Sequence, residues 1–580
     1  MKSNEKLEGQ EWNIYIPVLP NILMVYITKK KIKGHTYLYL EESIRINGKR
    51  QRAWQKYLGP EDSLKDLKIR NIFSKHSNDI RTESLEFGVS AALSRIANKI
   101  ELARIIDERT DKSRNQGLTV GEYITIAAIN RCAAPCSKSR LPRWFEKDWL
   151  SSRYDIDPEI LNAQTYWNHF QYLSEEKIND IELALNKTVL KEFDLSLDCL
   201  FYDPTNFFTY SRKKSKDGLL QFGHSKENRN GNRLVSYTLL CARESGIPLM
   251  HYSYAGNVND ARLFKQMPSK IERRLKKLGQ DPKSVTLVFD KGNHSQEAFK
   301  AIHESGYGFI ASIRNSMNKK LLQVPEEKYT ETTLPSTGKV VKYYKTSKIL
   351  YGMERDVYLV LDPKKYKKHA IAFNEKLDEK VENIRAYFKD RLNVKKWRQQ
   401  AAVEKKMAKM IGRNPYKKCL GFKVSGSFGN LSFQVRIDEN ERRRHLNTLG
   451  KSVLFTNNRG WSPESIIMGY REQYIVEHAF RKMKSPTSIT IRPMFHSSDS
   501  CIRAHVFLCV LAYLLISLLR LDLARNSFSI SHERLLEELG SIHVLKIKLS
   551  PKGKPLWKMD TTCGLARKLV KKLKLKQLIN

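Results

Sequence analysis

The segment between residues 195 and 313 constrains the fold of this chain most, because short apolar runs alternate there with amphipathic stretches. Strands are predicted at 195–208, at two runs within 233–257, at 284–290 and at 307–313. Helices are predicted at about 260–278 and at 295–306. The order of three strands, a helix, a strand, a helix and a strand predicts a mixed α/β sheet.

The segments on both sides of this region have different patterns. Residues 12–60 alternate polar and apolar side chains, and Asn-Gly-Lys at 47–49 predicts a hairpin turn between basic strands. Residues 85–190 carry apolar residues at the three-and-four spacing of helices. Residues 314–450 interrupt the α/β pattern and include a charged helical stretch at 362–420.

A helix is predicted to resume at about residue 462 and to run through the segment SPESIIMGYREQYIVEHAFRKMK. Ser462 is the predicted N-cap, and Pro463 suits the first helical position. The remaining segment, 499–580, is predicted to be helical and basic at its end. The predicted domains are a basic β-hairpin region (1–80), a helical region (81–190), a first core part (191–313), an insertion (314–450), a second core part (451–525) and a basic helical C-terminal region (526–580).

The charge of the chain predicts a polyanionic partner, most often nucleic acid. Lys and Arg number 103 against 62 Asp and Glu, and this surplus of 41 is spread along the chain. The alternative interpretation is a solubilising surface. The eight cysteines are too sparse for a disulfide scaffold, and the polar first residues do not resemble a signal peptide. We therefore expect a reduced, cytoplasmic protein.

The most apolar run, residues 506–523, is borderline in length for a membrane span. Arg520 interrupts it, and polar segments flank it. We therefore interpret it as a buried helix and expect no membrane partner.

Three carboxylates stand out by their positions. Asp203 closes the first predicted strand, Asp290 closes the fourth, and Glu477 lies on the helix that resumes after the insertion. The ends of adjacent strands bring their last side chains together, and a helix packed on the sheet can add a third acid. Such oxygen ligands suit Mg²⁺ or Mn²⁺, and two ions can activate a water or a 3′-hydroxyl against a phosphodiester.

Each acid also has a simpler interpretation. Asp203 and Asp290 can each bond the backbone of a turn, and Glu477 can face solvent on its helix. The joint pattern favours a site, because Tyr470, Glu477 and Lys484 are spaced by seven and so lie near one helical face. A tyrosine, an acid and a lysine on that face suggest a metal ligand flanked by phosphate contacts.

At these residues the chain resembles a known family, the insertion-sequence transposases of the DDE class. The subgroup is the one with a Tyr-Arg-Glu-Lys signature helix and a β-rich insertion. The matching stretches are FYDPTNFF, GHSKENR, YSYAGNVNDARLF, LVFDKGNHS, LFTNNRGWSPESIIMGYREQYIVEHAFRKMKS and IRPMFH, which extend from about residue 195 to residue 510. The resemblance implies a multidomain α/β protein. Its RNase H-like mixed-sheet core would be interrupted by a β-rich and helical insertion, with an N-terminal β-hairpin, a helical DNA-binding region and a helical C-terminus.

The resemblance also implies roles for individual residues. Asp203, Asp290 and Glu477 match the metal-binding triad, with Mg²⁺ or Mn²⁺ as cofactor, in two copies. Tyr470 and Lys484 match the signature residues that contact DNA near the reacting phosphate. The signature arginine is replaced by Gln473, which carries no charge, so Arg471 and Arg481 are candidates to supply that contact.

Further DNA contacts are expected in two other places. Lys226 and Arg229 lie in the loop at 218–233, which is alternatively a solvated loop. In relatives an aromatic residue of the insertion stabilises a flipped base, for which Trp397 and Trp461 are candidates unless they simply pack in the core. The resemblance implies that the N-terminal 180 residues recognise the inverted repeats of the element, and that the protein acts on double-stranded DNA as at least a dimer.

The sequence leaves three alternatives to transposition open. A nuclease with the same fold but without strand transfer, a catalytically inactive DNA-binding regulator and a membrane-surface protein are the alternatives. Loss of an acid would mark the regulator, and all three candidate acids are present. Cys501, His505 and Cys509 follow one another at intervals of four, which would allow zinc binding but indicates a core helix beside an apolar run.

Overall fold

The structure is a computed structural model. It describes residues 24–579 apart from 33, 47–48, 61–80, 112–116, 212–217, 228, 230, 336, 493, 549–554 and 561. The chain divides into two compact units. The smaller one comprises the described parts of Met1–Leu85, His543–Thr561 and Ile579–Asn580, and the larger one comprises Glu86–Ile542 and Thr562–Leu578.

The described part of the smaller unit contains two sheets of three strands. The first has the order β1-β2-β3, with β1 at Met24–Ile32, β2 at His35–Ile46 and β3 at Lys49–Pro60. The second has the order β17-β16-β4, with β4 at Arg81–Glu86, β16 at His543–Lys548 and β17 at Leu556–Met559. The predicted hairpin is confirmed by the pairing of Ile46 with Lys49, while its turn residues 47–48 and residues 12–23 lie outside the described part.

Helices fill the larger unit before and after its sheet. The first set is α3 (Gly88–Lys99), α4 (Leu102–Asp107), α5 (Val120–Ala133), α6 (Leu141–Lys147), α7 (Leu150–Tyr154), α8 (Ala163–Phe170) and α9 (Glu175–Glu192). The last set is α20 (Asp499–Arg525), α21 (His532–Gly540) and α22 (Gly564–Lys572). Helix α5 begins with a capping box between Thr119 and Glu122.

Helix α20 is the central helix of this part. It is long and apolar enough to cross a membrane, and 89% of its most apolar window is buried inside the protein. It packs against α3 and α5. The prediction of a buried helix at 506–523 is therefore confirmed, and the cysteines and the histidine at its start, as predicted, belong largely to this core.

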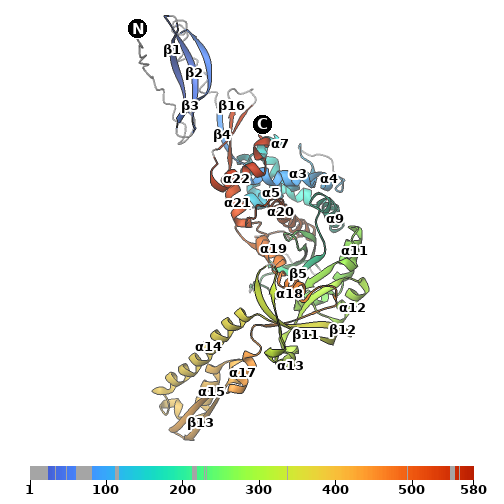
Figure 1. Cartoon of the computed structure of the whole chain (residues 1–580), viewed down its shortest axis with the longest axis vertical. Helices are drawn as coiled ribbons and strands as arrows, with labels where there is room; N and C mark the ends of the chain where they lie inside the picture. The colour runs from blue at the N-terminus through green and yellow to red at the C-terminus, as the bar shows by residue number, and fades with distance from the viewer. Residues whose placement is uncertain are drawn as a thin grey trace. The chain divides into compact units, whose positions relative to one another are not determined.

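The core of the larger unit is a nine-stranded mixed sheet with the order β10-β11-β12-β15-β9-β8-β5-β6-β7 (Figure 1). The predicted mixed α/β fold is confirmed. Its strands are β5 (Cys199–Phe208), β6 (Leu234–Ala242), β7 (Pro248–Ala255), β8 (Thr286–Phe289), β9 (Gly308–Ile313), β10 (Thr330–Leu334), β11 (Lys339–Leu350), β12 (Met353–Leu361) and β15 (Lys451–Thr456). The helices between or after them are α10 (Asp260–Phe264), α11 (Met267–Lys277), α12 (Gln296–Ser305), α13 (Lys319–Leu322), α18 (Pro463–Arg471) and α19 (Tyr474–Lys484).

The segment between β12 and β15 has a hydrophobic core of its own. It contains α14 (Pro363–Lys389), α15 (Gln400–Ile411), α16 (Tyr416–Cys419), β13 (Leu420–Ser427), β14 (Asn430–Ile437) and α17 (Glu439–Leu446), several of which are labelled together in Figure 1. Leu377, Ile384, Val403 and Met407 are at the centre of this small core. The residues before it, 330–361, extend the main sheet instead.

Three details of the prediction were wrong. The segment 499–580 is not helical throughout, because the strands β16 and β17 lie within it and pair with each other. The first strand, β5, does not end at Asp203. It pairs with β6 as far as Phe208, and only its pairing with β8 ends before Asp203. The predicted helix from residue 462 to residue 484 is two helices, α18 and α19. The chain turns at Glu472, whose carboxylate pairs with Arg243 Nε at 2.6 Å, and at Gln473, which is buried.

Helices α4 and α5 pack closely at Gly121. A Cβ atom at Gly121 would collide with the backbone of Ala103, so Gly121→Ala should destabilise the fold by about 1–3 kcal/mol. The matched control is Gly421→Ala on β13, where a Cβ atom meets no atom within 4 Å. Urea unfolding of the two variants measures the difference, and equal midpoints would contradict the tight contact.

Candidate active site

Asp203 and Asp290 occupy equivalent positions on two neighbouring parallel strands. The ladder between β5 and β8 ends with the pair Tyr202 and Phe289, and each aspartate is the next residue of its strand. Adjacent strands lie about 4.8 Å apart, and side chains at the same level point to the same face. The parallel pairing therefore places the two carboxylates side by side, although they are 87 positions apart in the chain.

Within the described part of the chain, the side chain of neither aspartate makes the hydrogen bonds of a turn residue. Asp290 stands at the N-cap position of the short 3₁₀ helix η4 (Lys291–Asn293), and its side chain makes no capping hydrogen bond. Instead, its Oδ1 accepts from Tyr470 and from Ser312, both at 3.2 Å. Asp290 is thus held by side chains from α18 and β9 and not by its own turn.

The electrostatics of Asp203 show that several acids surround it. Burial raises the pKa of Asp203 to about 7, Lys226 opposes the rise, and the carboxylates of Asp290, Asp260 and Glu477 add to it. The acids named by the sequence therefore interact with one another in the folded chain. Asp203 therefore holds its proton to a higher pH than an ordinary aspartate, and a bound cation would lower its pKa again.

Tyr470 orients Asp290 from helix α18. Its hydroxyl lies 2.6 Å from Ser312 Oγ and 3.2 Å from Asp290 Oδ1. Because the hydroxyl has a single proton, it donates to one of these two oxygens at a time. Burial raises the pKa of the Tyr470 phenol above its ordinary value, so the phenol stays protonated at physiological pH. It is a neutral donor and does not add a further negative charge.

Glu477 approaches this region from α19, which packs against β5. Its side chain is exposed, and it has no hydrogen-bond or ion-pair partner among the described residues. No three His, Cys, Asp or Glu side chains in the described part of the chain are gathered closely enough to hold a metal ion. The two aspartates lie side by side, whereas the only effect of Glu477 on Asp203 among the described contacts is the electrostatic repulsion that raises the pKa of Asp203.

The chemistry of these residues fits a divalent cation. All three candidate ligands offer carboxylate oxygens, which are the preferred ligands of Mg²⁺ and Mn²⁺. Repulsion from Asp290, Asp260 and Glu477 contributes to the raised pKa of Asp203, and a cation would remove that cost. Lys226, whose charge lowers the pKa of Asp203, is itself paired with another acid.

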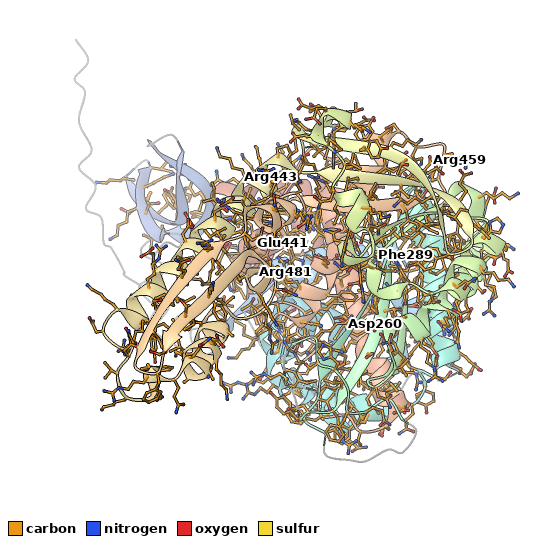
Figure 2. All side chains as sticks on the ribbon, turned by 90° about the horizontal axis from the view of Figure 1, so that it is seen from below. Asp260, Phe289, Glu441, Arg443, Arg459 and Arg481 are labelled. Atoms are coloured by element: carbon orange, nitrogen blue, oxygen red, sulfur yellow. The ribbon has the colours of Figure 1, made fainter. Side chains whose placement is uncertain are left out.

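That acid is Asp260, which the sequence did not single out. Lys226 Nζ lies 2.9 Å from Asp260 Oδ2 and donates to the carbonyl oxygen of Pro204 at 2.6 Å. Tyr254 donates to the other oxygen of Asp260 at 2.8 Å. Asp260 begins α10 and is labelled in Figure 2 with Phe289, the last residue of β8. In the sequence it resembles an ordinary first-turn acid, which is why only the structure identified it.

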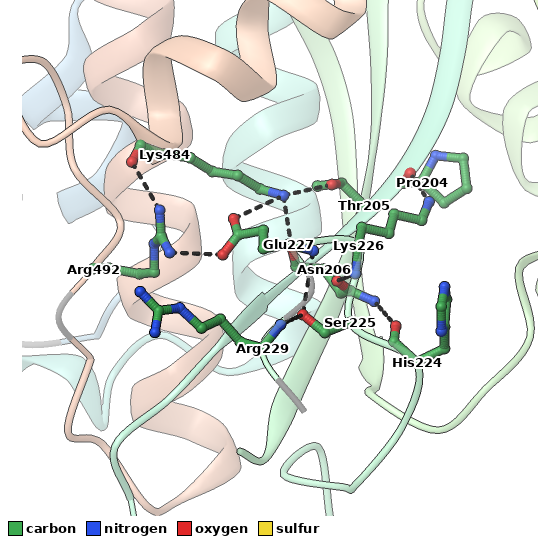
Figure 3. A network of polar contacts seen from close by, with 10 residues as sticks. All are labelled: Pro204, Thr205, Asn206, His224, Ser225, Lys226, Glu227, Arg229, Lys484 and Arg492. Atoms are coloured by element: carbon green, nitrogen blue, oxygen red, sulfur yellow. Dashed lines mark hydrogen bonds and ion pairs between the residues drawn. The ribbon is translucent and has the colours of Figure 1, made fainter. Parts of the chain in front are cut away.

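Lys484 lies in a second polar network beside the acids (Figure 3). Its Nζ donates to Thr205 Oγ1 at 2.7 Å and to the carbonyl oxygen of Asn206 at 2.6 Å, just beyond Asp203 on β5. Glu227 lies 3.5 Å from the same Nζ and pairs with Arg492 at 2.6 Å. Burial lowers the pKa of Lys484 to about 8, and Glu227 opposes that shift.

One comparison with known proteins identifies the family of this chain. A family model described as the transposase DDE domain matches residues 198–515, which is more than half of the chain. The chain belongs to the DDE transposase family. No curated protein sequence matches it.

Two solved transposase structures show weak similarity. The piggyBac transposase synaptic complex with hairpin DNA has a TM-score of 0.35 and 8% identity, over 79% of this chain and 82% of that one. The Mos1 transposase paired-end complex with the left transposon end has a TM-score of 0.15 and 12% identity, over 34% of this chain and 61% of that one.

The other residues expected to contact DNA in this transposase have varied surroundings. Arg471 donates to Asp362 at 2.9 Å, and Gln473 is only 8% exposed. The guanidinium of Arg229 lies 5.7 Å from the centre of the Phe208 ring. Arg481 is exposed and has no ion pair among the described residues.

The two tryptophans proposed for a flipped base are in packed environments. Trp397 makes edge contacts with Tyr387 and Phe388 in the core of the insertion. Trp461 packs close to Gly469 of α18, where an added Cβ atom would lie 3.2 Å from its ring. These contacts favour a packing role for both.

The raised pKa of Asp203 predicts a pH-dependent stability of the metal-free transposase. The unfolded chain loses this proton near the ordinary value of 3.8, whereas the folded protein keeps it up to about 7. The free energy of unfolding of the wild type should therefore fall, relative to that of Asp203→Asn, as the pH rises from 4 to 7. Above pH 7 the difference should level off. We expect the variant to be about 1–3 kcal/mol more stable at pH 8 and nearly equal at pH 4 in urea unfolding.

The matched control is Asp198→Asn, at the exposed beginning of the same strand. Its effect on stability should not grow over this pH range. A gain for Asp203→Asn that is the same at pH 4 and pH 8 would contradict a carboxyl protonated by burial and repulsion.

Proposed function

We propose that this transposase binds the terminal inverted repeats of its insertion sequence, cuts DNA there and joins the freed ends to target DNA. The observation that carries the proposal is the pair of carboxylates, Asp203 and Asp290, at the end of the parallel ladder between β5 and β8. The family match supports the reaction class, which is phosphodiester hydrolysis followed by transesterification.

Asp203, Asp290 and Glu477 would hold Mg²⁺ or Mn²⁺. Two such ions would activate the attacking oxygen and stabilise the leaving oxygen of the phosphodiester. In the first step a water oxygen attacks phosphorus and a 3′-hydroxyl leaves. In the second step that 3′-hydroxyl attacks a phosphorus of the target strand, and the 3′-oxygen of the target leaves as a hydroxyl. The same residues serve both steps because only the nucleophile changes.

The surrounding residues position these acids. Tyr470 and Ser312 orient Asp290 by hydrogen bonds, and Lys226 keeps Asp260 paired beside Asp203. Lys484 holds the strand beyond Asp203 through Thr205 and Asn206. We propose that Lys484 and Tyr470 also approach the DNA near the reacting phosphate.

The net charge of the chain supports DNA binding, because Lys and Arg outnumber Asp and Glu by 41. We propose that residues 1–80 and 81–190 recognise the inverted repeats, and that Arg481, with the basic insertion at 314–450, contacts the backbone. Joining two ends requires at least a dimer on DNA.

A second candidate is a transposase-derived DNA-binding protein without catalysis. One observation favours it, because Glu477 is not gathered with the aspartates closely enough to hold an ion. A nuclease lacking strand transfer would differ only in the second step. Cleavage and joining assays separate these three functions.

The decisive prediction concerns metal-dependent cleavage. On a supercoiled plasmid that carries the DNA flanking this gene, the wild-type protein should cut the element ends with Mg²⁺ and not with EDTA. Asp203→Asn, Asp290→Asn and Glu477→Gln should each reduce cleavage by about 100-fold or more, because each removes a ligand of the reacting ions. Gel analysis of nicked and linear products measures the effect.

The control variant is Glu304→Gln, an exposed acid on α12 outside the site. It should cut at the wild-type rate. Binding of the ends without cutting by the wild-type protein would support the inactive regulator, and cutting without joined products would support the nuclease.

Binding to the element ends should weaken steeply with salt, because phosphate contacts release counterions. Contacts to six or more phosphates predict at least about a 1,000-fold loss of affinity between 50 and 200 mM salt. Arg481→Gln should reduce the slope of log affinity against log salt by about one. Arg534→Gln is the control, since Arg534 is already paired with Glu537 and Glu538. An affinity independent of salt would contradict the phosphate contacts.

A further inference from the structure

A large cavity in the larger unit lies outside the acidic site. Its volume is about 1160 Å³, above the range of about 300–1,000 Å³ typical of small-ligand pockets. Its walls are the loop after α5 with the 3₁₀ helix η1 (Lys138–Arg140), the helix α8, and the segment that leads into α20. The cavity is large enough for a nucleotide with its phosphates.

The walls of this cavity are basic. Arg131, Lys138, Arg140 and Arg492 line it, and no Asp or Glu is among its described lining residues. The Nε groups of Arg131 and Arg492 are buried and have no hydrogen-bond acceptor among the described residues. Arg492 also pairs with Glu227, whereas the other three basic side chains have no ion pair among the described residues, and such a wall is suited to an anion.

Two other features of the cavity favour a phosphate. Ser497, Ser498 and Ser500 line it at the N-terminus of α20, a 27-residue helix whose dipole favours an anion there. Lys138 Nζ lies 3.3 Å from both His496 Nε2 and His505 Nδ1. Burial, followed by repulsion from Arg131, lowers the pKa of Lys138 to about 7, and a bound anion would reverse this shift.

Exposed aromatic rings complete the cavity. Trp167 on α8 is 44% exposed and Phe495 is 69% exposed, and both line it. Tyr210 stacks on Phe495 with ring centres 5.7 Å apart and is 51% exposed itself. Exposed rings beside cations are the stacking platforms on which proteins bind unpaired bases.

The cavity is connected to the acidic site by one polar chain, which Figure 3 shows in part. Arg492 lines the cavity and pairs with Glu227, Glu227 pairs with Lys484, and Lys484 bonds Thr205 on β5. One DNA strand could therefore contact both places.

We propose that this cavity binds an unpaired nucleotide, with its phosphate on the cations and its base stacked on Trp167 or Phe495. The DNA strand as the source of this nucleotide rests on the proposed function. A free nucleotide has the same chemistry, and the experiment separates the two sources.

The test is fluorescence anisotropy of the full chain in EDTA with a labelled twelve-nucleotide thymidine strand and an abasic strand of equal length. Trp167→Ala and Phe495→Ala should weaken binding of the thymidine strand about 5- to 100-fold and leave the abasic strand unaffected, because only bases stack. Phe528→Ala, at a partly buried ring outside both the cavity and the regions proposed to contact DNA, is the aromatic control and should change neither affinity. Arg140→Gln should weaken both strands more than Arg143→Gln, since Arg143 does not line the cavity.

Equal binding of both strands by the wild type and both aromatic variants would overturn the proposal. Full displacement of the thymidine strand by micromolar thymidine monophosphate would assign the cavity to free nucleotides and overturn the DNA source. Because EDTA prevents cleavage and the acids are unchanged in these variants, the result does not depend on whether the transposase cuts DNA.

Discussion

The parallel pairing of β5 with β8 is the constraint on which the rest of the site depends. It aligns Asp203 with Asp290 at the end of a ladder whose other residues are buried. Two adjacent carboxylates repel each other, and the burial of Asp203 increases the cost of its charge. The apolar residues before them keep both strands in the core, so the sheet holds the acids together despite their repulsion.

The cations near the acids are largely engaged within the protein. Lys226 pairs with Asp260, and Lys484 and Arg492 share Glu227. Among the described residues, no lysine or arginine is bound to the pair of aspartates, so a metal ion would not have to displace one. The positive charge that we propose for DNA lies elsewhere, on exposed residues such as Arg481 and on Arg131 and Arg140 in the walls of the cavity beside α20.

The acidic site and the basic cavity complement each other in charge. The first would attract cations and the second would attract phosphate, and Arg492 with Glu227 connects the two. A strand of DNA that passes from one to the other would meet the cations of the cavity and, at the acids, the metal ions proposed there, which links strand positioning to the proposed chemistry.

Local pattern was sufficient to predict the mixed α/β order, the buried helix at 506–523 and the three candidate acids, because apolar spacing and strand-end position are properties of short segments. It was not sufficient for the break at Glu472, which depends on Arg243 far away in the sequence, or for Asp260, which resembles any first-turn acid. The sequence by itself determined which residues are candidates to carry the chemistry. Only the tertiary structure decided which of them meet, because the register of β5 against β8, the pairing of Lys226 and the cavity lined by Trp167 arise from contacts between distant segments.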